Sequence, residues 1–227
     1  MKTYMPKTIA LMTLAAQFII LAGCAKKEPK TIICIGDSLT TCGGADGRYT
    51  DYLAKWLPRH KIINKGVDGD TLAGGRARFQ KDVIDLKPDI VVIELGANDF
   101  WRRERPVTEL RADLEDMVIR AKAIGAEVVI ASCFGNRTFN TEQNVEFSQD
   151  RFDFADAIAQ METEIAKKHA CFYVPNMQVD IKPNGTMPYW EDNNHPNALG
   201  NRFVAKRILK ELKKALRKNA KKTASSP

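Results

Sequence analysis

The sequence predicts an α/β domain of three layers, an α/β/α sandwich in which a five-stranded parallel sheet has helices on both faces. Short runs dominated by Val, Ile and Ala, with Gly or Pro nearby, alternate along the chain with helix-like stretches. Strands that alternate with helices are typical of βαβ units, and these units build parallel sheets. The chain shows no internal repeat and no interdomain linker, so a single domain is expected over residues 31–217.

Each element of this domain is expected from its own pattern. The strand-like runs are short and apolar. They occupy residues 31–36, 61–66, 89–95, 127–132 and 171–175. The stretches between and after them are expected to form helices at about 46–57, 72–86, 107–124, 149–169 and 197–217.

A serine follows the first strand-like run. Gly36 ends that run, so Ser38 is expected at the carboxyl end of the strand, where open α/β sheets place their ligand crevice. Two later segments supply the partners that a nucleophilic serine needs. The segment 96–99 also follows an apolar run, and the segment 192–196 holds a carboxylate and an imidazole three residues apart. These three segments in this order indicate a hydrolase.

The chemistry gives each residue an expected role. A serine hydroxyl is a weak nucleophile near neutral pH and needs an adjacent base that a third group orients. His195 is the expected base, and Asp192 is expected to fix its tautomer and to stabilise the imidazolium. The oxyanion hole is expected to use the backbone N–H of Ser38, the side-chain amide of Asn98 and the backbone N–H of Gly66.

These segments resemble the marker blocks of the SGNH or GDSL-type hydrolases. The family's Gly-Asp-Ser block is matched at Ser38 and its glycine block at Gly66. Its Gly-x-Asn-Asp block is matched at Asn98, and its Asp-x-x-His-Pro block at Asp192 and His195. The order of the blocks is the same. The resemblance implies a sheet order of 2-1-3-4-5 and a serine hydrolase that requires no cofactor.

The resemblance covers most of residues 30–213. Segments 67–71 and 92–96 are most similar to the bacterial branch that contains thioesterase I, lysophospholipases and arylesterases. One departure is Asn193, where many members carry glycine before the histidine. Asparagine also accepts left-handed backbone angles, so the turn can still form.

Each polar segment also has a purely structural interpretation. Aspartate and serine are preferred helix N-caps, so residues 36–38 could simply begin a helix. Asn98 and Asp99 could form a turn, and His195 with Pro196 could begin the last helix. Their common position at one edge of the sheet favours the catalytic interpretation.

Other site classes find no support in the sequence. There is no Gly-x-Ser-x-Gly around Ser38, no Walker A loop, and no dinucleotide-binding pattern in the glycine-rich stretch 66–75. The three histidines, His60, His169 and His195, are far apart in the chain. No metal site and no metal cofactor are therefore expected.

The N-terminus is predicted to be a targeting segment. Residues 1–23 have a basic start and an apolar core that is too short for a membrane-spanning helix. They lead into Leu-Ala-Gly-Cys24, which resembles a bacterial lipoprotein processing site and implies lipidation of Cys24. Residues 24–30 would then tether the domain to a membrane outside the cytoplasm, on its periplasmic side or at the cell surface. A plain secretory signal is the alternative.

The basicity is concentrated at the C-terminal end. The formal net charge is +7, and residues 202–222 hold ten Lys or Arg but only one acidic residue. This distribution is not the footprint of a nucleic-acid-binding domain. An amphipathic last helix is expected, with its cationic face in solvent or, alternatively, against anionic lipid. Residues 218–227 are expected to form a basic, disordered tail.

Four cysteines follow Cys24: Cys34, Cys42, Cys133 and Cys171. An exported location permits disulfides, but the spacing does not choose among the three possible pairings. Free buried thiols are favoured at Cys34 and Cys133, because cysteine in a strand is often a small buried hydrophobe.

Together these patterns predict a monomeric, membrane-anchored esterase or thioesterase that acts on a small-molecule or glycan-linked acyl ester. The irregular segment 134–148, with Tyr189 and Trp190, is expected to shape the substrate pocket. The first alternative is a carbohydrate O-acetylesterase of the same family. The second is a non-catalytic lipoprotein that binds glycan or lipid.

Overall fold

The computed structural model describes residues 28–134, 148–181, 188–192 and 194–225. Five strands form one parallel sheet in the order β2-β1-β3-β4-β5. This confirms the predicted fold class and the order that the family resemblance implied. The strands are β1 (Thr31–Gly36), β2 (Lys61–Gly66), β3 (Ile90–Glu94), β4 (Glu127–Ala131) and β5 (Phe172–Val174).

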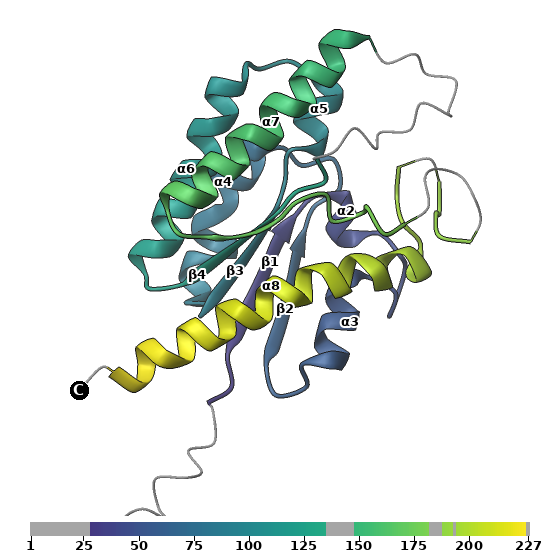
Figure 1. The fold of residues 1–227 in the computed structure, drawn as a ribbon. Coiled ribbons are helices and arrows are strands. Elements are labelled where there is room, and N and C mark those ends of the chain that lie inside the picture. The colour runs from purple at the N-terminus through teal and green to yellow at the C-terminus, as the bar shows by residue number, and fades with distance from the viewer. Residues whose placement is uncertain (1–27, 135–147, 182–187, 193, 226–227) are drawn as a thin grey trace, which may run out of the picture.

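Helices cover both faces of this sheet (Figure 1). On one face lie α3 (Tyr49–Trp56) and α8 (Ala198–Ser225), and on the other lie α4 (Leu72–Asp82), α6 (Val107–Ala123) and α7 (Gln149–Lys168). Two short helices, α2 (Ser38–Thr41) and α5 (Ala97–Arg102), follow β1 and β3, and a 3-10 turn, η1 (Ile84–Leu86), precedes β3. The helices α2 and α5 fall outside the helix ranges expected from the sequence, and η1 forms the end of the range expected at 72–86.

The core lies along the central strands. The side chains of 32–35, 90–93 and 128–130 are at most 2% exposed, because helices cover both faces of these strands. The register brings Gly36 level with Gly66 on one side and with Glu94 on the other. The loops after β1, β2 and β3 therefore meet at one edge of the sheet, which is where parallel sheets place their sites.

The last helix is longer than the sequence predicted. It continues to Ser225, so the expected disordered tail is wrong for residues 218–225. The cause is Glu127, a carboxylate with no exposed surface at the start of β4, which pairs with Lys218 at 3.0 Å and with Lys222 at 2.5 Å. Asn219 adds a hydrogen bond to the backbone oxygen of Asp89 at 3.3 Å. These contacts dock the end of the helix onto the sheet.

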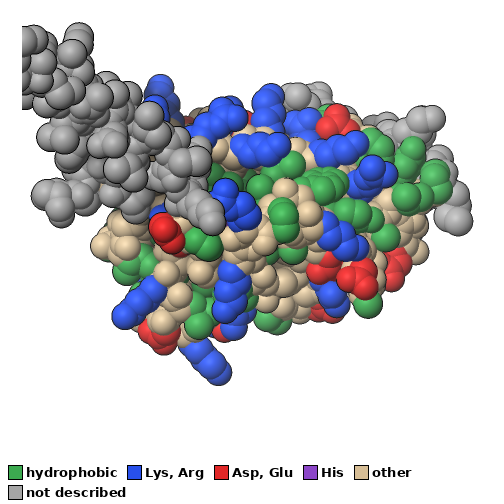
Figure 2. Space-filling view, turned by 90° about the horizontal axis from the view of Figure 1, so that it is seen from below, with side chains coloured by type: hydrophobic (Ala, Val, Ile, Leu, Met, Phe, Trp, Pro, Cys, Tyr) green, Lys and Arg blue, Asp and Glu red, His purple; other side chains and the backbone are tan. Residues whose placement is uncertain are grey.

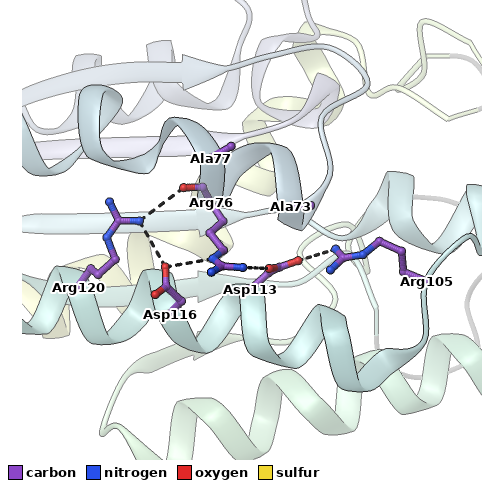
Figure 3. Close-up of a pocket in the computed structure, with 7 residues that line it drawn as sticks. All are labelled: Ala73, Arg76, Ala77, Arg105, Asp113, Asp116 and Arg120. Carbon is purple, nitrogen blue, oxygen red and sulfur yellow. Dashed lines mark hydrogen bonds and ion pairs between the residues drawn. The ribbon is translucent and has the colours of Figure 1, made fainter.

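A hollow of about 540 Å³ lies between α4 and α6 (Figure 3). Its arginines are already paired. Asp113 accepts hydrogen bonds from Arg76 at 2.9 Å and from Arg105 at 2.5 Å, and Asp116 accepts one from Arg120 at 3.3 Å. The hollow is thus bounded by ion pairs that join α4 to α6.

The described part of the chain bears on the other predictions in three ways. Cys34, Cys42, Cys133 and Cys171 are all free thiols, and Cys34 and Cys133 are buried as expected. Within the described residues, none of the helices has both the length and the apolar character needed to cross a membrane. The predicted signal segment with Cys24, Asn193 and most of the 134–148 segment lie outside the described residues.

Candidate active site

Ser38, the candidate nucleophile, lies on a tight turn between β1 and α2. Asp37 caps α2, since its Oδ1 accepts the backbone N–H of Leu39 at 2.9 Å. The capping role belongs to Asp37, which leaves the hydroxyl of Ser38 available. The turn requires Gly36, because a Cβ there would lie 2.0 Å from Thr40 Oγ1 and 2.7 Å from the backbone oxygen of Glu94.

Ser38, His195 and Asp192 form one continuous hydrogen-bonded relay. Nε2 of His195 lies 2.9 Å from Oγ of Ser38, and Nδ1 of His195 lies 2.8 Å from Oδ2 of Asp192. The three side chains come from segments that are more than 150 positions apart in the chain. The sequence analysis predicted that these three side chains lie together, and the structure brings them into hydrogen-bonding contact. A nucleophile, a base and an orienting carboxylate require this geometry.

Asp192 is held as a carboxylate. Its Oδ1 accepts the backbone N–H groups of Asn194 at 2.7 Å and of His195 at 2.8 Å. Partial burial opposes ionisation, but these two N–H groups and the His195 ring outweigh it, so the pKa of Asp192 lies below its usual range. The carboxylate can therefore stabilise an imidazolium at neutral pH.

The loop that carries His195 is fastened to the rest of the site. Its own backbone closes through Glu191 N–H to the carbonyl of His195 at 2.8 Å. The amide of Asn201, fully buried in the first turn of α8, donates to the carbonyl of Cys42 at 2.8 Å and to that of Pro196 at 3.1 Å. Asn201 thus links the nucleophile's loop to the histidine's loop. The sequence reasoning missed it, although a polar residue on an otherwise apolar helix face was the available signal.

Two of the three expected oxyanion donors, Gly66 and Asn98, already donate hydrogen bonds within the protein. The N–H of Gly66, one of the three predicted donors, already donates to Oδ1 of Asn64 at 2.8 Å. The N–H groups of Ser38 and of Gly69 have no acceptor among the described residues. Gly69 has a φ of +73°, which favours glycine, and the sequence analysis did not select it.

Asn98 lies beside these donors but is engaged. Its Nδ2 donates to the carbonyl of Asp70 at 2.9 Å and to Oδ2 of Asp37 at 3.2 Å. Both hydrogens of the amide therefore have acceptors. The longer bond, to Asp37, is the one that an oxyanion would have to replace.

A layer of buried carboxyl groups underlies the site, and the sequence analysis did not foresee it. Glu94 accepts the hydroxyl of Thr40 at 2.8 Å, and burial raises its pKa well above the usual range. Burial likewise raises the pKa of Asp37 to about 7 and that of Glu162 to about 8. An acidic residue that ends an apolar strand, as Glu94 does, was the signal that could have revealed this layer.

The comparison with known families decides the chain's membership. The model of the GDSL-like lipase/acylhydrolase family matches residues 34–203, a span that contains the whole relay.

The chain belongs to this family.

The chain is also similar to two curated esterases and to one solved esterase structure. The chain is 33% identical to esterase TesA of Pseudomonas aeruginosa over 125 residues. The matched segment is 49% of this chain and 62% of that protein, which is less than two thirds of its length. It is 27% identical to an acetylxylan esterase of Geobacillus stearothermophilus, over 80% of this chain and 93% of that one. The crystal structure of TesA has the same fold, with a TM-score of 0.70 at 24% identity over 82% of this chain and 99% of that one. The chain is thus an ester-bond hydrolase of the GDSL type.

Among the described residues, no group of three or more His, Cys, Asp or Glu side chains is arranged to hold a metal ion.

Proposed function

We propose that the chain is a serine hydrolase that cleaves ester or thioester bonds through an acyl-enzyme on Ser38. The observation that carries this proposal is the relay from Asp192 through His195 to Ser38, with heavy-atom distances of 2.8 and 2.9 Å. Distances in this range allow His195 to take the serine proton as Oγ attacks an acyl carbonyl. His195 then returns the proton to the leaving group, and the same base activates the water that releases the acid.

The oxyanion of the tetrahedral intermediate is assigned to the N–H groups of Ser38 and Gly69, with Asn98 as the third donor. The first two donate to no acceptor in the part of the chain that the structure describes, which supports their use as donors to a developing charge. Asn98 joins them by exchanging its 3.2 Å bond to Asp37. Preorganised donors of this kind are usually the largest electrostatic contribution to acyl transfer.

The test is a Ser38→Ala variant assayed with p-nitrophenyl esters from acetyl to palmitoyl, one acyl-CoA and one acetylated glycan. We expect turnover to be abolished on every substrate that the wild type cleaves, with a nearly unchanged melting temperature, because the loss of a single partly buried hydroxyl costs little stability. Near wild-type turnover in the variant would overturn the proposal. Trapping an acyl adduct on Ser38 by mass spectrometry tests the intermediate separately.

A carbohydrate O-acetylesterase is the second candidate function. The acetylxylan esterase from Geobacillus stearothermophilus is matched over 93% of its length, a larger share than for the Pseudomonas esterase. The same substrate panel separates the candidates. Preference for acetyl esters and acetylated glycan supports this one, and preference for longer acyl chains supports a thioesterase or lysophospholipase. A chain with no turnover on any of them would instead support a non-catalytic binding protein.

We also propose that the chain is a lipoprotein anchored through Cys24 outside the cytoplasm. The support is the Leu-Ala-Gly-Cys sequence after a basic start and a short apolar core. Several acyl chains on one residue give stable anchoring, whereas a single chain binds only marginally. Cys24→Ser should abolish labelling by an alkynyl fatty acid in growing cells. Label retained by the serine variant would place the lipid elsewhere or refute the anchor.

A further inference from the structure

A row of cations without acidic partners among the described residues runs along α8. Five of its Lys and Arg residues follow one another at intervals of four, four, three and four positions, which keeps them on one face of a helix. All five are exposed, and none of them makes an ion pair with an acidic side chain among the described residues. This cationic row consists of Arg202, Lys206, Lys210, Lys213 and Arg217.

The opposite side of the same helix is committed to the core. Val204, Ile208 and Leu212 are at most 1% exposed, and they fix the rotation of α8 about its own axis. The cationic row therefore cannot turn inward. Figure 2, seen from below, shows Lys and Arg side chains gathered along one edge of the molecule, with few acidic side chains between them.

The row ends beside the point where the chain enters the domain. Asp89 receives an ion pair from Lys30 at 3.1 Å, and its backbone oxygen accepts a hydrogen bond from Asn219 of α8 at 3.3 Å. Lys30 and the last turns of α8 thus contact the same residue, Asp89. Figure 1 shows that the chain enters the domain on the side where α8 ends. Residues 24–30 can span at most about 25 Å when fully extended. An attachment of the chain at residue 24 would therefore keep the C-terminal end of α8 within about 25 Å of the attachment point.

We propose that the cationic row of α8 is a docking surface for an anionic phospholipid membrane. Cations within reach of an anionic leaflet are each worth about fivefold in binding, and a straight row of five can lie on a flat surface at the same time. This surface is independent of the ester chemistry and would remain if the proposed substrate class were wrong.

Residues 28–227 are the appropriate sample, because every core contact that the structure describes lies within them and any lipid on Cys24 is removed. Sedimentation with vesicles of pure phosphatidylcholine is compared with vesicles that contain 30% phosphatidylglycerol, at low and at high salt. We expect binding only to the anionic vesicles, and we expect salt to weaken it.

A matched pair of variants localises the surface. Lys210→Gln with Lys213→Gln removes two charges from the row, and Lys81→Gln with Lys167→Gln removes two exposed charges from α4 and α7 on the other face. The first double variant should lose at least about tenfold in vesicle binding, and the second should lose less than twofold. Both should keep full turnover on a soluble ester.

Three outcomes overturn the proposal: equal losses in the two double variants, equal binding to neutral and anionic vesicles, or no binding to either. A fourth is row-dependent binding to a short DNA duplex without binding to anionic vesicles, which would assign the row to nucleic acid. A tenfold loss confined to the row variant supports membrane docking.

Discussion

Asp192 is the most exposed member of the relay. The exposed fraction of its side chain is 56%, against 31% for His195. Its position nevertheless depends on two backbone N–H groups rather than on burial. A carboxylate held this way can orient an imidazole at the surface, but water can replace part of its effect.

Asp192→Asn separates orientation from loop structure. The asparagine Oδ1 can still accept the N–H groups of Asn194 and His195, but its Nδ2 would face Nδ1 of His195 and favour the wrong imidazole tautomer. A buried relay loses about 10⁴-fold in turnover on this change. We expect a smaller loss here, at least about tenfold, with an unchanged melting temperature because asparagine is as good a cap as aspartate.

The control for this prediction is Asp192→Ala, which removes both the orienting group and the backbone acceptor. It should lose activity and also some stability. Unchanged turnover in the asparagine variant would mean that Asp192 only shapes its loop.

At the scale of elements, the boundaries of the strands were predictable and the end of α8 was not. The strands β1, β3 and β4 are nearly continuous apolar runs, and Gly36 and Gly66 end β1 and β2, so these boundaries were visible in the sequence. The end of α8 depends on Glu127, which is 91 positions before Lys218. No local pattern reveals such a pairing, because a lysine-rich helix end looks the same whether or not a buried carboxylate faces it.

Glu127→Gln tests how the end of α8 is held. Burial opposes ionisation of Glu127, but Lys222, Lys218 and Lys122 outweigh it and lower its pKa to about 2. Its pairing therefore contributes stability above pH 4.5, and this contribution is lost as the pH falls toward 2. At pH 7 the glutamine variant should be destabilised by about 1–3 kcal/mol, and trypsin should cleave faster in 218–222. Glu164→Gln, at an exposed pair with Arg111, should leave stability almost unchanged, because exposed ion pairs contribute little.

The whole molecule shows which properties follow from local sequence. The sheet order and the relay were predictable, because Ser38, Asp192 and His195 stand in recognisable short motifs. The oxyanion donors were only partly predictable. Gly66 and Gly69 are three positions apart, and only the fold shows that the side chain of Asn64 occupies the first. The carboxyl layer of Asp37, Glu94 and Glu162 was missed because burial of a charge is a property of the assembled layers.

That layer makes the stability of the whole domain depend on pH. Because burial raises the pKa of Glu162 to about 8, the folded state favours its neutral form. The stability associated with this group is fully present below about pH 4.5 and is lost as the pH rises through 8. Asp37, with a pKa of about 7, acts in the same direction. The wild type should therefore melt at a lower temperature at pH 9 than at pH 5.

Glu162→Gln is the variant that tests this without touching the relay. Glutamine keeps an acceptor for the hydroxyl of Tyr173, which lies 3.4 Å from the carboxylate, but it cannot ionise. Its melting temperature should fall by several degrees less than that of the wild type between pH 5 and pH 9, since 1 kcal/mol corresponds to about 2–4 °C in a domain of this size. Glu164→Gln, on the exposed side of the same helix, should follow the wild-type curve. If all three curves were parallel, Glu162 would be ionised in the folded state at neutral pH, and the neutral carboxyl layer beneath the active site would be refuted.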